Sequence, residues 1–321
     1  MRDARALIAI DEDDEIAALK VAAKQWATGD GSRAVIVGVA PSLSMAITNP
    51  KIVSLAKDAE GMLLAQLRER IDELRDDIGA PCEQHLVCGR PADEIIKTAV
   101  LQKADLVVKA ADRGVGENSP PFGSVEKKLI RKCPTPVWIV RTERTEPPRR
   151  LAIAIDNPEA AVRRDEAELL AASLFNHAID LATRFGITAI DVIHAWTAHA
   201  VAFLSSPRSG LSPEDLENYV AEWKQITTLW FDRVIAEANE KYAGSGVTFT
   251  PKLVMGEPKQ AIPQAAAQLG TDLLVMGSAN RSGVPGLFIG NTAEGVIDQL
   301  ECSVYVVKPE GFKSVLAPNL N

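Results

Sequence analysis

The sequence repeats itself at a constant spacing. Residues 89–140 and 256–307 align without a gap at an offset of 167. The starts of the two copies also match, because Ala6-Leu-Ile-Ala-Ile-Asp11 corresponds to Leu151-Ala-Ile-Ala-Ile-Asp156. Such internal similarity indicates two copies of one folding unit in tandem, so every candidate function has to be considered once in each copy.

Within each copy, short apolar runs alternate with longer segments of helical periodicity. In the first copy we expect strands at 6–10, 34–39, 84–88, 105–109 and 136–140, and helices at 14–28, 50–78, 91–103 and 123–132. In the second copy we expect strands at 151–155, 188–194, 247–255, 272–276 and 303–307, and helices at 163–185, 212–242, 259–269 and 290–300. Nearly continuous apolar strands are typical of parallel sheets that helices cover on both faces. Each copy is therefore predicted to be an α/β domain with an open, doubly wound sheet of five parallel strands.

The repeat also predicts the domain organisation. We expect a first domain over 1–141, a linker over 142–150, a second domain over 151–310 and a tail over 311–321. The linker is charged and contains Pro147-Pro148, so it should be extended and exposed. The first Asp and the shared Gly-x-Pro lie 78 residues apart in the first copy and 100 in the second. We expect much of this excess at 196–213.

Composition excludes several classes of partner. A net charge of −8 and a pI of about 5.2 disfavour direct binding of nucleic acid, which depends on clustered Lys and Arg. No apolar run approaches the ~20 residues that a membrane span requires. The four cysteines lack zinc or CxxC spacing, which favours free thiols in a reducing cytoplasm. His177, His194 and His199 lack the spacing of a metal site, so no metal ligand is predicted.

Candidate ligand-binding residues gather at predicted strand ends. Ligands of open α/β sheets bind beyond the carboxyl ends of the strands, where Asp11 and Asp156 follow the first strand of each copy. A glycine-containing loop follows the fourth strand of the second copy, and glycines with a helix N-terminus suit a phosphate group. The candidates in the second copy are Asp156, Gly277, Ser278, Asn280, Arg281, Gly290, Asn291 and Thr292; the weaker first-copy equivalents are Asp11, Gly123 and Ser124.

These positions resemble the universal stress protein family, whose nucleotide-binding members carry Gly-x2-Gly-x9-Gly-Ser/Thr after the fourth strand and an Asp after the first. Segments 129–138 and 290–298 most resemble the tandem E-type members. The resemblance implies two domains of the adenine nucleotide α-hydrolase type. It also implies that they pair through their last strands, 136–140 and 303–307, as an intramolecular pseudo-dimer that serves stress adaptation in the cytoplasm.

The two copies depart from the family motif to different degrees. The first reads Ala110-x2-Arg113-x9-Gly123-Ser124 and has lost both leading glycines. Its loop also holds Glu117, which repels phosphate, and two prolines, which lack a backbone N–H. The second copy reads Gly277-x2-Asn280-x9-Gly290-Asn291, and Asn tolerates the left-handed backbone better than most residues. The motif therefore leaves ATP or another adenine nucleotide open as a ligand of the second copy alone.

Several functions remain open at this point. No phosphate-binding Gly-x4-Gly-Lys loop and no Gly-x-Ser-x-Gly elbow occurs, so we predict no catalytic residues and a non-enzymatic stress protein. One alternative is a nucleotide-regulated switch or slow ATPase that works through the second copy. Another is a binder of an apolar or lipid-like molecule, suggested by the apolar runs 200–204 and 284–289. The glycines can also reflect loop geometry alone, Asp11 and Asp156 can simply cap helices, and further homo-oligomerisation stays open.

Overall fold

The computed structural model describes residues 5–12, 14–27, 33–44, 48–79, 82–111, 121–143, 145–157, 164–198, 200–206, 209–278, 290–312, 314 and 316. The first copy contains β1 (Arg5–Ile10), α1 (Ile16–Ala27), β2 (Arg33–Pro41), α2 (Pro50–Ile78), β3 (Glu83–Gly89), α3 (Pro91–Leu101), β4 (Leu106–Ala110), α4 (Ser124–Lys132) and β5 (Val137–Val140). The second contains β6 (Leu151–Ala154), α5 (Arg164–Phe185), β7 (Ala189–Trp196), α6 (Val201–Leu204), α7 (Pro213–Lys241), η3 (Ala243–Ser245), β8 (Thr248–Met255), α8 (Pro258–Gln268), β9 (Leu273–Gly277), α9 (Asn291–Ile297) and β10 (Ser303–Val307).

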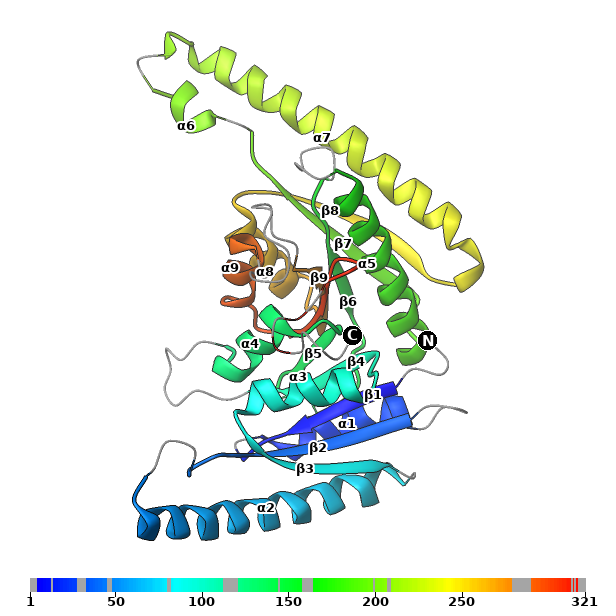
Figure 1. The fold of residues 1–321 in the computed structure, drawn as a ribbon. Coiled ribbons are helices and arrows are strands. Elements are labelled where there is room, and N and C mark those ends of the chain that lie inside the picture. Colours follow the sequence, from blue (N-terminus) through cyan, green and yellow to red (C-terminus); the bar gives the residue numbers. More distant parts are fainter. Residues whose placement is uncertain are drawn as a thin grey trace.

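Ten strands of the described residues form one continuous sheet, in the order β3-β2-β1-β4-β5-β10-β9-β6-β7-β8 (Figure 1). Within each copy the pairing is parallel, as predicted, and only β5 and β10 pair antiparallel. The strands of one copy therefore run opposite to those of the other. The carboxyl ends of the first-copy strands and those of the second-copy strands, and with them the two candidate sites, therefore face in opposite directions.

Helices cover both faces of this sheet, which explains why its strands are apolar along their whole length. One core cluster combines buried residues of α1, α2, α5 and α7 with one face of the strands. A second cluster combines α3, α4, α8 and α9 with the other face. The α/β fold predicted from the repeat is thus confirmed. Each of the two core layers contains residues of both copies, so the copies share their hydrophobic core.

The two longest helices begin as their sequences predict. Asn49 caps α2, and its side chain accepts a hydrogen bond from the backbone N–H of Lys51, with Pro50 as the first helical residue. Ser212 begins α7 with a capping box in which its side chain and that of Asp215 each bond the other's backbone N–H. The predicted end of the last helix was too late: α9 stops at Ile297, and residues 298–299 continue as a turn.

The placement of the extra residues in the second copy was partly wrong. Helix α5 has 22 residues, whereas its counterpart α1 has 12, so a large share of the excess lies before β7 rather than in 196–213. The buried residues of the two helices match as Ala18, Leu19 and Ala22 against Leu174, Phe175 and Ala178. This match places the additional residues, 164–171, at the start of α5; we call them the α5 extension. Residues 201–204 form the short helix α6 beside the start of α7.

The two copies meet through their last strands, as the resemblance implied. Trp138 of β5 lies directly opposite Tyr305 of β10, its equivalent in the repeat, as a pseudo-twofold axis requires. On one face, the Trp138 ring packs against Trp26 of α1 at 5.4 Å between centroids and Phe185 of α5 at 5.8 Å. The Tyr305 hydroxyl lies 3.1 Å from Nδ1 of His177. The pairing of the copies thus joins aromatic side chains from both.

On the other face, helix α4 of the first copy meets α9 of the second. Lys127 Nζ lies 2.7 Å from Asp298 Oδ1, and Arg131 forms an ion pair with Glu294. The buried ammonium of Lys308 donates to the backbone carbonyl of Ile130. That carbonyl lies in the last turn of α4, where no intrahelical donor is left for it, so the second copy satisfies the end of a first-copy helix.

Candidate functional site at the carboxyl ends of the strands

The described candidate residues of the second copy lie at the carboxyl edge of its sheet. Asp156 follows β6, and Gly277 ends the adjacent parallel strand β9, so both stand at the same edge. Gly290 is the N-cap of α9, and Asn291 and Thr292 are the first two residues of that helix. The candidates Asn280 and Arg281 lie outside the described residues, as do the apolar run 284–289 and His199.

Two of these candidates have packing roles. A Cβ atom added to Gly277 would come within 2.7 Å of the Leu170 side chain, so glycine lets α5 approach β9 closely. Ser278 is buried, its backbone N–H donates to the carbonyl of Val307 at 3.1 Å, and its hydroxyl lies 3.4 Å from the same oxygen. Gly277 and Ser278 therefore contribute to the core whether or not a ligand binds nearby.

In the first copy, the corresponding edge is filled by a buried ion cluster. The ammonium of Lys109, in β4, lies 3.2 Å from Asp11 Oδ2, 2.6 Å from Asp14 Oδ1 and 3.1 Å from Glu126 Oε1. Lys109, Asp14 and Glu126 have side chains that are 1%, 0% and 0% exposed, so water does not screen these charges. We call Lys109, Asp11, Asp14 and Glu126 the Lys109 cluster. The first-copy candidate Asp11 is thus committed to an internal ion pair.

The loop that carries Asp11 is also held from the outside. Arg70 of α2 donates to the backbone carbonyls of Asp11 and Glu12, each at 2.9 Å, and to that of Asp14. The other first-copy candidates, Gly123 and Ser124, form the N-cap and first residue of α4. Since α4 also contributes Glu126, the helix that would face a phosphate instead brings a carboxylate to the cluster.

Burial and the charges of the Lys109 cluster shift the pKa values of Asp14 and Lys109. Burial raises the pKa of Asp14 from 3.8 to about 8, against the lowering effect of the Lys109 charge. Burial would lower the pKa of Lys109, but the charges of Asp14, Asp11 and Glu126 raise it well above its usual range. The lysine therefore stays charged, and Asp14 takes up a proton on folding at neutral pH.

This proton gives the protein a pH dependence that can be measured. A folded-state pKa above the unfolded one means that the folded protein binds more protons, so stability should fall as pH rises from about 4 to about 8. Burial lowers the pKa of His177 and His194, so these two histidines make the stability rise with pH below about pH 6.5. We therefore expect the unfolding free energy in urea, compared between pH 5 and pH 8, to fall more in the wild type than in Asp14→Asn. Equal pH dependence in the two proteins would contradict this account.

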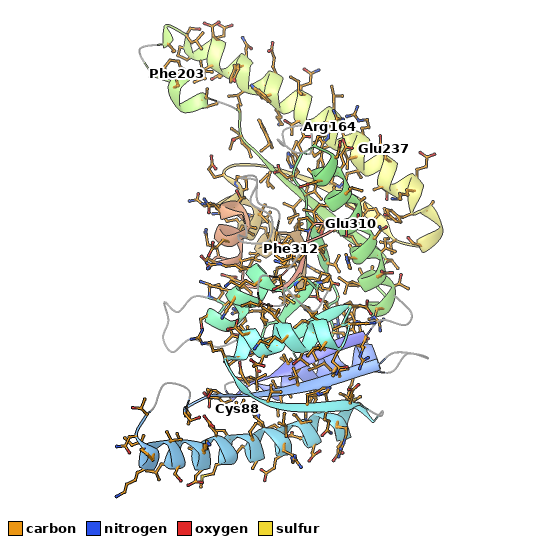
Figure 2. The ribbon with its side chains drawn as sticks, in the orientation of Figure 1. Cys88, Arg164, Phe203, Glu237, Glu310 and Phe312 are labelled. Carbon is orange, nitrogen blue, oxygen red and sulfur yellow. The ribbon has the colours of Figure 1, made fainter. Side chains whose placement is uncertain are left out.

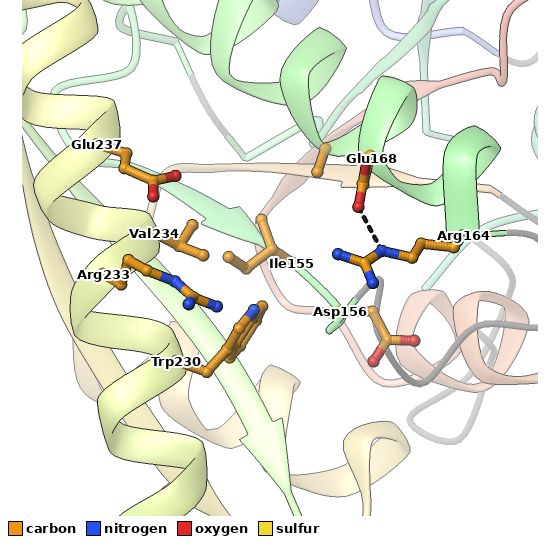
Figure 3. A pocket seen from close by; sticks show the side chains of 9 residues that line it. Ile155, Asp156, Arg164, Glu168, Trp230, Arg233, Val234 and Glu237 are labelled. Atoms are coloured by element: carbon orange, nitrogen blue, oxygen red, sulfur yellow. Dashed lines mark hydrogen bonds and ion pairs between the residues drawn. The ribbon is translucent and has the colours of Figure 1, made fainter.

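The second copy has a pocket beside Asp156, the repeat equivalent of Asp11 in the Lys109 cluster. The pocket has a volume of about 460 Å³ and lies beyond the end of β6, between α5 and α7 (Figure 3). Its lining residues are Ile155, Asp156, Arg164, Glu168, Ala171, Trp230, Arg233, Val234 and Glu237. The second copy has no counterpart of the buried ion cluster, because Met276 occupies the position equivalent to Lys109 and Ala293 that of Glu126; both lie in the core layer on the other face of the sheet from the pocket.

The pocket brings Asp156 together with residues that were not predicted from the sequence. Of the candidates that the structure describes, only Asp156 lines it, and Arg164, Trp230 and Arg233 were missed. Lys109 was missed as well, although a lone lysine within the apolar run 106–110 is a signal that could have found it. The run 200–204 does not line this pocket: Phe203 of α6 is 63% exposed and stands apart from Arg164 and Glu237 (Figure 2).

Two further predicted features concern membranes and metals. None of the helices in the described part of the chain has both the length and the hydropathy needed to cross a bilayer. Within the same ranges, His, Cys, Asp and Glu side chains form no group of three suited to hold a metal ion. The imidazole of His194, one of the three histidines considered, is buried with Nδ1 3.0 Å from the carbonyl of Ile155 and packs on Trp230.

Comparison with known proteins gives consistent matches over both copies. The family model described as the universal stress protein family matches residues 4–141 and 165–308. Universal stress protein E of Salmonella typhi is 27% identical over 240 residues, which are 74% of this chain and 72% of that protein. A solved structure from Pseudomonas aeruginosa UCBPP-PA14 has a TM-score of 0.61 at 22% identity and covers 96% of this chain and 94% of its own. A universal stress protein from Archaeoglobus fulgidus DSM 4304 has a TM-score of 0.58 at 15% identity, and the match covers 94% of this chain and 96% of that chain. At these identities the two structures support the fold alone.

Proposed function

Because this chain belongs to the universal stress protein family, we propose that it is a non-enzymatic stress-response protein that binds a small ligand through its second copy alone. The proposal assigns the first copy to residues 1–141 and the second to 151–310, joined by a linker over 142–150 and followed by a tail. It places the protein in the cytoplasm, with which four free cysteines agree.

The Lys109 cluster carries this proposal. Its four side chains occupy the carboxyl edge of β1 and β4 in the first copy, where a ligand of an open α/β sheet would bind. Removing the buried ammonium from its three carboxyl partners to admit a ligand would cost several kcal/mol. The second copy lacks both Lys109 and Glu126 and has a pocket of about 460 Å³ beside Asp156. In this proposal the two copies share one fold but differ in role: the second binds the ligand, and the first contributes stability.

An adenine nucleotide is the second candidate ligand, again in the second copy. It is favoured by Gly290, which is the N-cap of α9 in an extended conformation and, as a glycine, has no side chain of its own to bond the first backbone amides of the helix. Asp156 at the end of β6 would accept hydrogen bonds from an adenine amine or a ribose hydroxyl. A nucleotide-regulated switch or a slow ATPase would use these same groups.

Native mass spectrometry tests the proposal, because it detects a bound molecule by its mass whatever its chemistry. We expect the purified protein, alone or with added Mg-ATP, to carry at most one small molecule per chain. The Gly290→Asp variant should lose ATP, because the new carboxylate repels phosphate while Asp remains a favourable N-cap. The repeat-equivalent Gly123→Asp variant is the matched control and should behave as the wild type. Two identical ligands per chain, or loss of ligand from Gly123→Asp alone, would show that the first copy binds.

A further inference from the structure

The pocket of the second copy has a wall that the first copy does not possess. Arg164, Glu168 and Ala171 line it from one side, and all three belong to the α5 extension. The opposite wall is the middle of α7, with Trp230 and Arg233. The additional residues therefore do more than lengthen a helix, because they place a charged side chain across from α7.

The first copy shows what happens to this space without the extension. Helix α1 packs along α2, and Lys20 of α1 lies 3.0 Å from Glu73 and 3.5 Å from Asp77 of α2. Arg70 and Arg233 are each the twenty-first residue of their helix. The guanidinium of Arg70 donates to backbone carbonyls of the loop after β1, whereas Arg233 lines the pocket. At the same helix position, the first copy therefore has an arginine that holds a loop in place, and the second has an arginine that lines a pocket.

The pocket combines an apolar floor with two converging guanidinium groups. Arg164 and Arg233 point into it from opposite walls, with Ile155 between them (Figure 3). Trp230 and Ile155 are 7% and 5% exposed, so together with Val234 they offer a largely buried apolar surface. Arg164 Nε also donates to Glu168 Oε1 at 2.7 Å, which orients the guanidinium. A volume of about 460 Å³ lies within the roughly 300–1,000 Å³ typical of small-molecule sites.

We propose that this pocket binds a small amphipathic anion, with a single acid group between Arg164 and Arg233 and an apolar body against Ile155, Trp230 and Val234. The proposal rests on the function proposed above and names the ligand class for the second copy. It concerns a surface between α5 and α7, distinct from the helix N-terminus at Gly290 that a nucleotide phosphate would use.

The balance of charges selects one acid group rather than several. Two arginines and three carboxylates (Asp156, Glu168 and Glu237) line the pocket, which gives a net charge of −1. A ligand with several negative charges would meet this excess, while a single carboxylate can still pair with a planar guanidinium through two hydrogen bonds. An organic cation would approach two guanidinium groups on opposite walls of the pocket, and an uncharged apolar molecule would make no charge-assisted contact with either.

A matched set of three naphthalene probes tests the charge preference on the full chain. Isothermal titration should show that 1-naphthoate binds at least tenfold more tightly than the neutral 1-naphthylmethanol, and more tightly than the cationic 1-naphthylmethylamine. The Arg233→Gln and Arg164→Gln variants should each weaken 1-naphthoate by about tenfold or more, the usual effect of a lost charge-assisted hydrogen bond. Both arginines are exposed, so neither substitution should prevent folding. The Trp230→Leu variant should weaken the acid and the alcohol alike.

Two controls separate recognition from general electrostatics. Lys224→Gln removes a positive charge from an exposed position of α7 outside the pocket and should leave binding unchanged. Glu237→Gln removes one lining carboxylate and should strengthen 1-naphthoate binding several-fold.

The outcomes distinguish this inference from the proposed function. Tighter binding of the amine, an equal loss with Lys224→Gln, or no binding of any probe would overturn the anion pocket. If the probes fail while one ATP per chain is still lost through Gly290→Asp, the second-copy function stands and the α5–α7 pocket is not its site. If 1-naphthoate binds twice per chain, with one site insensitive to both arginines, confinement to the second copy fails as well.

Discussion

Replacing Lys109 by Met should lower the unfolding free energy by about 3–5 kcal/mol, the usual cost of breaking a buried ion pair by removing one partner. The variant places in the first copy the residue that the second copy has, Met276. It leaves Asp11, Asp14 and Glu126 buried around a side chain without charge. Urea unfolding followed by circular dichroism at pH 7 measures the loss.

Two further variants show whether the loss comes from uncompensated charge. Adding Glu126→Ala to Lys109→Met reproduces Ala293 of the second copy and removes one buried carboxylate, so part of the stability should return. Lys252→Met removes a lysine from a partly exposed ion pair of 3.5 Å with Asp191 and should cost less than about 1 kcal/mol. If Lys109→Met is as stable as Lys252→Met, the cluster does not hold the first copy together.

Replacing Trp138 by Ala should cost about 3–5 kcal/mol, as for other large aromatic side chains removed from a core. Trp138 is 1% exposed and lies where the two copies meet. Its ring contacts Trp26 of the first copy and Phe185 of the second, at 5.4 and 5.8 Å between centroids. The cavity would therefore open between the copies, and neither copy could fill it alone. Urea unfolding measures the loss, and limited proteolysis within 142–150 reports loosening of the junction.

The matched control is another tryptophan with different surroundings. Trp223 of α7 is partly exposed and makes an edge contact with Tyr219 at 6.4 Å. Trp223→Ala should change the unfolding free energy by less than about 1 kcal/mol and leave cleavage of the linker unchanged. If both alanine variants lose the same small amount, the aromatic contacts at the junction contribute little to the pairing of the copies.

The fold could be predicted because local and long-range signals agree. Apolar strands in a βα alternation require a parallel sheet, and the repeat requires that sheet twice. The pairing of the last strands, 136–140 and 303–307, followed from the family resemblance and is confirmed, and the structure shows that it is antiparallel. The extra residues of the second copy were harder to place, because the apolar run at 200–204 is the more conspicuous segment. The α5 extension instead continues an existing helical pattern, so nothing in its periodicity marks it as an insertion.

The candidate site was predictable only as a region. Strand ends identify the edge of the sheet, and Asp156 indeed lines the pocket there. The arginines could not be identified, since Arg164 and Arg233 lie on two helices whose separation depends on how each packs on the sheet. Lys109 is conspicuous within its strand, but Asp14, one of its partners, lies 95 residues earlier in the chain. Only the tertiary structure shows that a lysine among apolar residues meets three carboxylates.

The antiparallel junction of β5 and β10 within one chain also determines how the pairing responds to dilution. Separate subunits exchange partners and come apart at low concentration, whereas two units joined by a short linker experience an effective concentration in the millimolar range. The partner of each half is therefore always the other half of the same molecule. On the function proposed above, in which only the second copy binds a ligand, every chain would therefore carry one ligand site however scarce the protein becomes.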